Sequence, residues 1–183
     1  MWWQSLTMTI SNTAKYTVRD ICIIALLTIV LFVQEELLTF LPNIQLTIFL
    51  MILYSKVLGF KKTFLIIVIY LLLDCIVMGA LNPIFMIFQL LGWEVIPALM
   101  CTIFKKIDSN IILAVLAMLF SFIYSWTMIL PGCIITNLSF NEYLVADILF
   151  EFLLALSSFL STLVLYKPFK KLLLFETKKY YQK

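Results

Sequence analysis

Apolar residues along this chain form long continuous runs, separated by short polar or basic segments. The runs show no strict alternation of apolar and polar positions, which excludes transmembrane β-strands. A helix needs about 20 mostly apolar residues to cross a bilayer. The pattern therefore predicts an all-α integral membrane protein with six transmembrane helices. We expect these helices at 21–41, 44–58, 63–80, 83–104, 110–131 and 144–166.

The breaks between the runs are of unequal strength. Pro42–Asn43 ends the first helix, and Gly79–Pro83 folds the chain back between the third and the fourth. The second run, 44–58, is the weakest span, because about 15 residues cover only about 22 Å of a hydrocarbon core about 30 Å thick. Its length alone does not predict that 44–58 crosses the membrane, so the distribution of charged residues has to support that assignment.

The basic residues supply that support. With six crossings, all 13 Lys and Arg residues fall on one side of the membrane, and the opposite loops contain none. If 44–58 failed to cross, Lys56, Lys61 and Lys62 would move to the other side. The positive-inside rule then places both termini in the cytoplasm. We expect a cytoplasmic segment at 1–20, a membrane domain at 21–166 and a basic cytoplasmic tail at 167–183.

Composition narrows the function. The chain is 64% hydrophobic and 13% charged, with mean hydropathy +1.10, which is typical of an integral membrane protein. It has no His, and its four Cys include no CxxC pair. These absences exclude the usual zinc sites and Ser-His or Cys-His catalysis. We expect no enzymatic activity, no metal, no cofactor and no nucleic-acid partner; the lipid bilayer is the expected environment.

Carboxylates inside the apolar runs are the strongest functional signal. Asp74 and Glu94 lie in the third and fourth spans, and neither span has a basic residue inside it to neutralise them. An intramembrane carboxylate costs a few kcal/mol, so it usually faces a partner or a wet cavity. Other polar and aromatic residues gather in the same outer half. The candidate substrate-binding residues are Asn43, Gln45, Asp74, Asn82, Gln89, Trp93, Glu94, Trp126, Asn137, Asp147 and Glu151.

The charge balance of this outer half restricts the ligand. A strongly anionic molecule would find no cation there and would meet repulsion from the acids. A neutral or cationic ligand with hydrogen-bonding groups and a flat apolar part suits carboxylates and tryptophans better. Simpler explanations stay open for each group. In these alternative interpretations, Glu35 and Glu36 are solvated loop residues and the buried acids are protonated and hydrogen-bonded between helices. Trp93 and Trp126 are anchors at the membrane interface.

The segment QEELLTFLPNIQLTIFLMILYSKVLGFKKT, residues 34–63, resembles the substrate-binding (S) components of energy-coupling factor (ECF) transporters, the vitamin uptake systems of bacteria. YLLLD, NPIF, LLGWEVIP, SFIYSW and FEFLLALSSFLSTLVLYKP also fit that pattern and extend the resemblance over roughly residues 20–170. It implies a six-helix protein of the bacterial cell membrane with both termini in the cytoplasm. It also implies that one vitamin or precursor binds near the outer face.

The resemblance further implies a lid and partners. The loop after the first helix, 41–45, would cover the ligand. The S component has no ATPase and docks on a membrane coupling (T) component with two ABC ATPases. Family members often dock through an Ala-xxx-Ala pattern in the first helix. Here Ala25 is followed four residues later by Ile29, so Ala25 and Thr28 are the candidate docking residues.

The vitamin and two rival functions stay open. The lack of outer cations argues against folate, pantothenate and biotin. Cobalamin, slightly favoured, riboflavin, thiamine or its pyrimidine, pyridoxine and queuosine remain. One rival is a non-transporting scaffold of the rod-shape (cell-wall morphogenesis) type, which has a similar LLLD-like third helix. The other is a small proton-coupled carrier that uses Asp74 or Glu94 as a relay.

Overall fold

The computed structural model describes residues 16–79 and 81–181 of the 183-residue chain. All regular structure in this part of the chain is helical, which confirms the expected all-α class. The helices are α1 (Val18–Leu38), α2 (Thr47–Leu58), α3 (Phe60–Val77), α4 (Pro83–Cys101), α5 (Asn110–Thr136) and α6 (Phe140–Tyr181). The polar lead at 1–15 lies outside the described residues.

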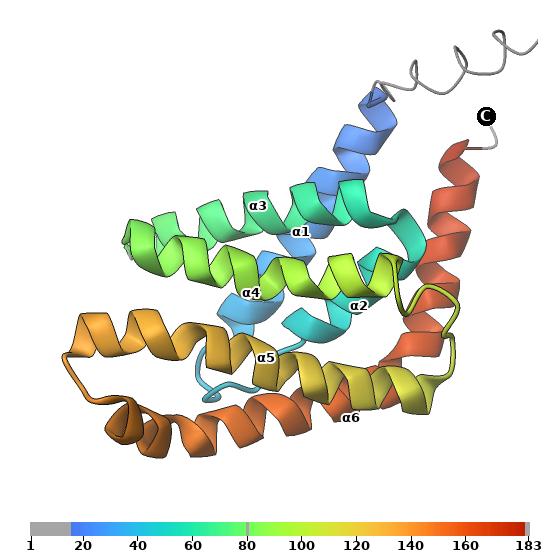
Figure 1. Ribbon diagram of the computed structural model, residues 1–183. Coiled ribbons are helices and arrows are strands. Elements are labelled where there is room, and N and C mark those ends of the chain that lie inside the picture. Colours follow the sequence, from blue (N-terminus) through green and yellow to red (C-terminus); the bar gives the residue numbers. More distant parts are fainter. Residues whose placement is uncertain (1–15, 80, 182–183) are drawn as a thin grey trace, which may run out of the picture.

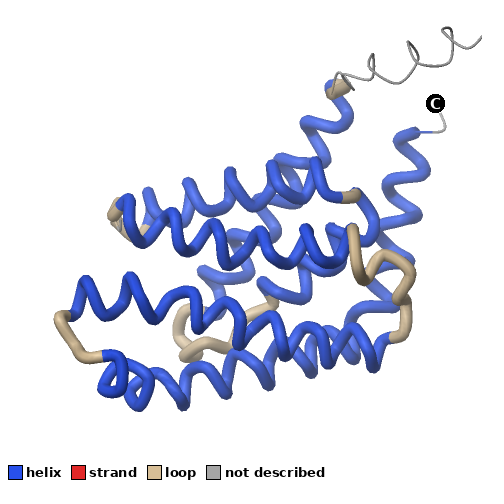
Figure 2. The backbone as a smooth tube through the Cα atoms, in the orientation of Figure 1, coloured by secondary structure: helices blue, strands red, loops and turns tan. Residues whose placement is uncertain are grey.

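The helices form two antiparallel pairs with a third layer behind them. α3 runs beside α4, and α5 runs beside α6 (Figure 1). α1 crosses behind these pairs at an angle, and the short α2 packs against α4 and α6. The tube view shows the turns collected at the two ends of these pairs (Figure 2). The α1–α2 loop is the exception, because it stops short of the α3–α4 and α5–α6 turns (Figure 1).

Four helices, α1, α4, α5 and α6, are long and apolar enough to cross a membrane. This is consistent with a membrane protein. α2 has only 12 residues, about 18 Å of helix. α3 has 18 residues and carries Lys61, Lys62 and Asp74. Six helices are therefore present, while six crossings and the cytoplasmic placement of the termini stay predictions.

Local sequence explains most helix ends. Thr17 and Asp20 form a capping box at the start of α1. The Asn82 side chain accepts backbone N–H groups of α4, and Pro83 occupies its first turn. Gly59 separates α2 from α3 at φ +79°, a conformation that L side chains rarely adopt.

Two helices run past the predicted ends. α5 continues through Pro131 to Thr136, and α6 continues through Pro168 to Tyr181. The basic tail is thus, as far as the structure describes it, the last part of α6. The apolar run ends at 166, but Leu173 still packs against the core, which holds the helix together beyond that point. α6 changes direction in this region (Figure 1), as expected where Pro168 removes a backbone donor.

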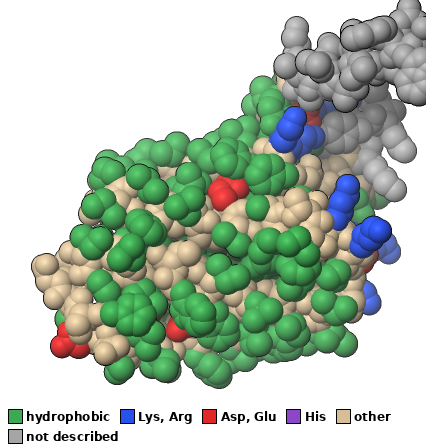
Figure 3. Space-filling view, viewed as in Figure 1, with side chains coloured by type: hydrophobic (Ala, Val, Ile, Leu, Met, Phe, Trp, Pro, Cys, Tyr) green, Lys and Arg blue, Asp and Glu red, His purple; other side chains and the backbone are tan. Residues whose placement is uncertain are grey.

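Basic side chains gather at one end of the molecule, and the other end of the face shown in Figure 3 has none. At this basic end the Lys56 ammonium donates to the carbonyl oxygens of Phe104, Lys105 and Ile107, at 2.6, 3.2 and 2.6 Å. These carbonyls follow the end of α4 and have no further turn to bond. The Lys56 side chain thereby fixes the α4–α5 loop.

Close packing of α4 on α5 depends on Gly92. A Cβ atom there would lie 2.6 Å from Thr127 Oγ1 and 2.9 Å from Tyr124 Cδ2. We predict that Gly92→Leu destabilises the protein by about 1–3 kcal/mol, because it overpacks this contact. Leu91→Ala, at a neighbouring exposed position, should change the apparent Tm in detergent much less. Equal effects of the two substitutions would contradict the packing role.

Asp108 in the α4–α5 loop should give the stability a pH dependence. Burial by itself raises the pKa of Asp108, but hydrogen bonds from Lys170 and Tyr166 and nearby positive charge hold it below its ordinary value of 3.8. A lowered folded-state pKa means that the stabilisation is complete above pH 3.8 and is lost as the pH falls through the lower value. The difference in apparent Tm between the native chain and Asp108→Asn should thus be constant from pH 5 to 8 and shrink below pH 4. A difference at pH 3 as large as the difference at pH 7 would contradict this assignment.

Candidate ligand-binding site

The α1–α2 loop is held in place by one side chain of α1. Gln34 Oε1 accepts the Leu46 N–H at 2.8 Å, and Gln34 Nε2 donates to Thr47 Oγ1 at 2.9 Å. The loop also reaches α6, where the Ser157 hydroxyl donates to the Asn43 carbonyl at 3.4 Å. Asn43 turns the chain at φ +54°, in the left-handed region that Asn tolerates. The loop is therefore anchored on two sides of the bundle.

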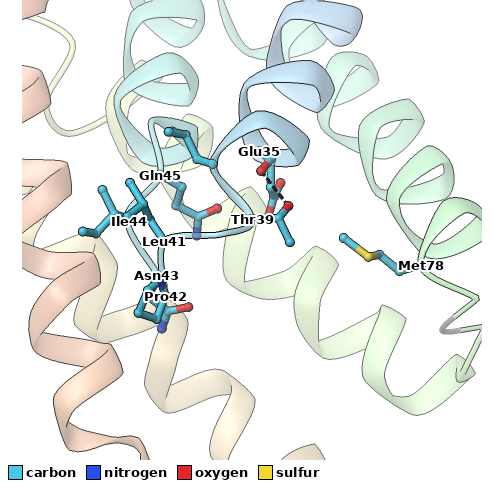
Figure 4. A pocket seen from close by; sticks show the side chains of 9 residues that line it. Glu35, Thr39, Leu41, Pro42, Asn43, Ile44, Gln45 and Met78 are labelled. Atoms are coloured by element: carbon cyan, nitrogen blue, oxygen red, sulfur yellow. Dashed lines mark hydrogen bonds between the residues drawn. The ribbon is translucent and has the colours of Figure 1, made fainter.

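This loop covers a cavity of about 270 Å³. Figure 4 shows Leu41 to Gln45 on one side of it and Glu35 and Thr39 at the end of α1, with Met78 facing them from the end of α3. The volume lies just below the usual range for small-molecule sites. The predicted lid residues Asn43 and Gln45 thus line a cavity together with Glu35.

Behind the cavity, polar side chains join three helices. The Tyr70 hydroxyl of α3 donates to the Glu35 carboxylate of α1. One turn further along α3, Asp74 accepts a hydrogen bond from Gln89 Nε2 of α4 at 3.4 Å. Tyr70 is fully buried and Gln89 is 6% exposed. These four side chains, Glu35, Tyr70, Asp74 and Gln89, are called the polar layer below.

Aromatic rings extend the layer to α5. Trp93 follows Gln89 by four residues, so both lie on one face of α4. The buried Trp93 ring stacks on Tyr124 of α5, with centroids 3.6 Å apart and planes at 12°. Tyr124 also lies within electrostatic range of Glu35, Asp74 and Asp147. It is therefore the point at which the layer meets the acidic face of α6.

Several buried atoms around this layer have no hydrogen-bond partner within the described residues. Gln89 Oε1 and the Trp93 indole nitrogen are two of them; the others near the outer half are Glu36 Oε1, both carboxylate oxygens of Glu94 and Glu151 Oε1. Buried polar atoms are normally bonded, because leaving one without a partner costs about 1–3 kcal/mol. Nearly all of these atoms are acceptors, so a partner for them would have to supply donor groups.

The remaining predicted residues are not members of the polar layer. Asn82 caps α4 through the N–H groups of Ile84 and Phe85, and Asn137 ends α5 in a left-handed conformation. Both positions have a structural role in a helix end. Trp126 is 62% exposed and does not share the buried stack of Trp93. Asp147 and Glu151 share one face of α6, where Glu151 is buried.

The predicted docking residues sit on α1. Ala25 is exposed, whereas Thr28 is buried and its hydroxyl donates to the Ile24 carbonyl at 2.8 Å. Both line a groove of about 440 Å³ between α1 and α3, whose other walls are apolar except for Tyr16. Thr28 thus presents little polar surface there, as close helix packing requires.

Sequence reasoning missed three members of the site. Glu35 was open to interpretation as a solvated residue, and Tyr70 and Tyr124 stand in apolar runs where tyrosine is unremarkable. One signal was available for Tyr70, because it precedes Asp74 by four residues and so shares its helix face. Tyr124 carries no comparable signal in the sequence.

The described residues contain no group of three or more His, Cys, Asp or Glu side chains that could hold a metal ion. No protein-family model matches the chain, and no characterised protein or solved structure is significantly similar to it. The family resemblance therefore stays a prediction that rests on the sequence motifs alone.

Gln34 gives a test of how the loop is held. Gln34→Leu removes two hydrogen bonds to residues 46 and 47, each worth about 0.5–1.5 kcal/mol. We predict about tenfold faster hydrogen exchange at the Leu46 amide, measured on the purified protein by mass spectrometry. The control is Thr39→Ala, which removes only an exposed hydroxyl bonded to the Glu35 carbonyl. Unchanged exchange in Gln34→Leu would show that the loop is held by other contacts.

Proposed function

We propose that the chain is the substrate-binding subunit of an ECF-type importer and captures a water-soluble vitamin or precursor. The single observation that carries this proposal is the polar layer beside the cavity under the α1–α2 loop. A buried layer with an acceptor left open at Gln89 is expensive in a membrane domain unless something binds it.

The charges around the layer favour a neutral or cationic ligand. Glu35 and Asp74 contribute carboxylates, and the basic side chains gather at the far end of the face shown in Figure 3. Donor groups on the ligand would bond these oxygens and Gln89 Oε1. A ligand with several N–H or O–H groups and a compact ring fits both this chemistry and the cavity of about 270 Å³.

Energy for uptake would come from partners. The sequence contains no G-x-x-x-x-G-K-[ST] phosphate-binding loop, which an ATPase subunit needs. In the proposed complex the groove at Ala25 and Thr28 meets the membrane coupling component, and two ABC ATPases act from the cytoplasm. The bacterial cell membrane and the cytoplasmic termini belong to the same proposal.

A ligand panel tests the function directly. The purified full chain is heated with thiamine, its pyrimidine, riboflavin, pyridoxine, cobalamin or queuosine, and with biotin, folate and pantothenate as anionic comparisons. A ligand at 100 times its Kd adds about 2.7 kcal/mol of stability, so one neutral or cationic compound should raise the apparent Tm clearly. The proposal would be overturned if only the anionic compounds stabilised the protein. It would also be overturned if no compound stabilised the protein and cell-wall proteins co-purified with it.

Variants of Gln89, in the polar layer, and of Glu94, outside it, test the site. Gln89→Leu and Glu94→Gln should each weaken binding of the panel's ligand by about tenfold or more, because each removes an acceptor that the ligand completes. Glu94→Gln should leave the apparent Tm of the unliganded protein unchanged, whereas Gln89→Leu also removes the hydrogen bond to Asp74 and should lower it. The matched control is Glu176→Gln, which makes the same change on α6 at the basic end. Equal affinities in all three variants and the native chain would place the ligand elsewhere.

A further inference from the structure

The last part of α6 does not continue the direction of the bundle. Beyond Pro168 it turns across the basic end, past the α2–α3 and α4–α5 connections (Figure 1). Helices α4 and α5 are long and apolar enough to span the bilayer. A helix that runs across the end of such spans lies at the level of the lipid headgroups.

This segment has an apolar face that the protein does not cover. Phe169, Leu172 and Phe175 follow each other at intervals of three, but the Phe169 ring packs edge-on against the buried Phe49 ring, with centroids 5.8 Å apart. Leu172 and Phe175, which are 57% and 65% exposed, form the uncovered apolar stripe. Leu173 follows Phe169 by four residues, so both lie on the side of the helix that packs against the core. The segment is thus fixed to the body by one face and presents a second apolar face outward.

Lysines flank the stripe. Lys167 and Lys171 are both exposed and, four residues apart, share a helix face. This basic face adjoins the apolar stripe at Phe175, which follows Lys171 by four residues. Lys170 is instead bound to Asp108 and lies 5.5 Å from the centre of the Tyr166 ring. The ion pair between Lys170 and Asp108 holds this segment against the α4–α5 loop and thereby fixes the rotation of the helix. Lys167 and Lys171 are not used in this contact.

We propose that residues 167–177 form an interfacial helix that binds anionic phospholipids. Leu172 and Phe175 enter the boundary between headgroups and acyl chains, and Lys167 and Lys171 contact the lipid phosphates. An apolar stripe beside a basic face is the pattern of helices that lie in the interface, and the positive charge complements an anionic leaflet. This surface is separate from the ligand site and independent of it.

The depth of the helix is measured with tryptophan variants of the full chain in lipid nanodiscs. Phosphatidylcholine brominated high in its acyl chains quenches nearby tryptophan, and the signal of the native tryptophans is subtracted. Leu172→Trp and Phe175→Trp should be strongly quenched, whereas Lys167→Trp, further round the helix from both, should be quenched little. If all three are quenched equally or not at all, the stripe does not face lipid and the proposal fails.

The lipid charge is tested by titrating phosphatidylglycerol against phosphatidylcholine and counting retained lipids by native mass spectrometry. Replacing both Lys167 and Lys171 by Gln should weaken phosphatidylglycerol retention by about fivefold per lysine. The matched control replaces Lys61 and Lys106, two exposed lysines at the same end. An equal loss in the control, or no loss in the Lys167/Lys171 variant, would overturn the assignment to this helix.

Discussion

The hydrogen bond from Tyr70 to Glu35 is the constraint on which much of this structure depends. It joins α1 to α3 at the fully buried Tyr70, so separating the helices would leave the Tyr70 hydroxyl without a partner. The bond from Gln89 to Asp74 joins α3 to α4 in the same way. Three helices are thus held in register by polar contacts inside an apolar bundle.

The aromatic stack and the loop complete this arrangement. Trp93 on Tyr124 brings α4 against α5, and this approach is possible because Gly92 has no side chain. Gln34 fixes the start of α2 close to the same layer. Because α2 is short, the loop before it stops short of the outer turns, and the cavity forms beside Glu35. Packing, loop position and cavity are therefore linked through one layer of the bundle.

The two ends of the molecule have different chemistry. At one end, lysines bond loop carbonyls and carboxylates, as Lys56 does with the α4–α5 loop and Lys62 with Asp20 at 2.5 Å. In the opposite half, acids and amides face one another across helices. Basic contacts at the first end stabilise connections, whereas the unbonded acceptors in the other half are suited to a ligand. The exposed stripe of α6 belongs to the first end and is suited to lipid.

The apolar runs determined the helical class, the breaks at Pro42–Asn43 and Gly79–Pro83, and the basic end, because hydropathy and backbone restriction are local properties. They also located Asp74, Gln89 and Trp93, since polar groups in apolar runs are conspicuous. Only the tertiary structure decided that Trp126 is exposed, that Asn82 and Asn137 finish helices, and that Tyr70 and Tyr124 join the polar layer. These outcomes depend on which face of each helix meets its neighbour, and near-uniformly apolar helices carry too little periodicity to define that face.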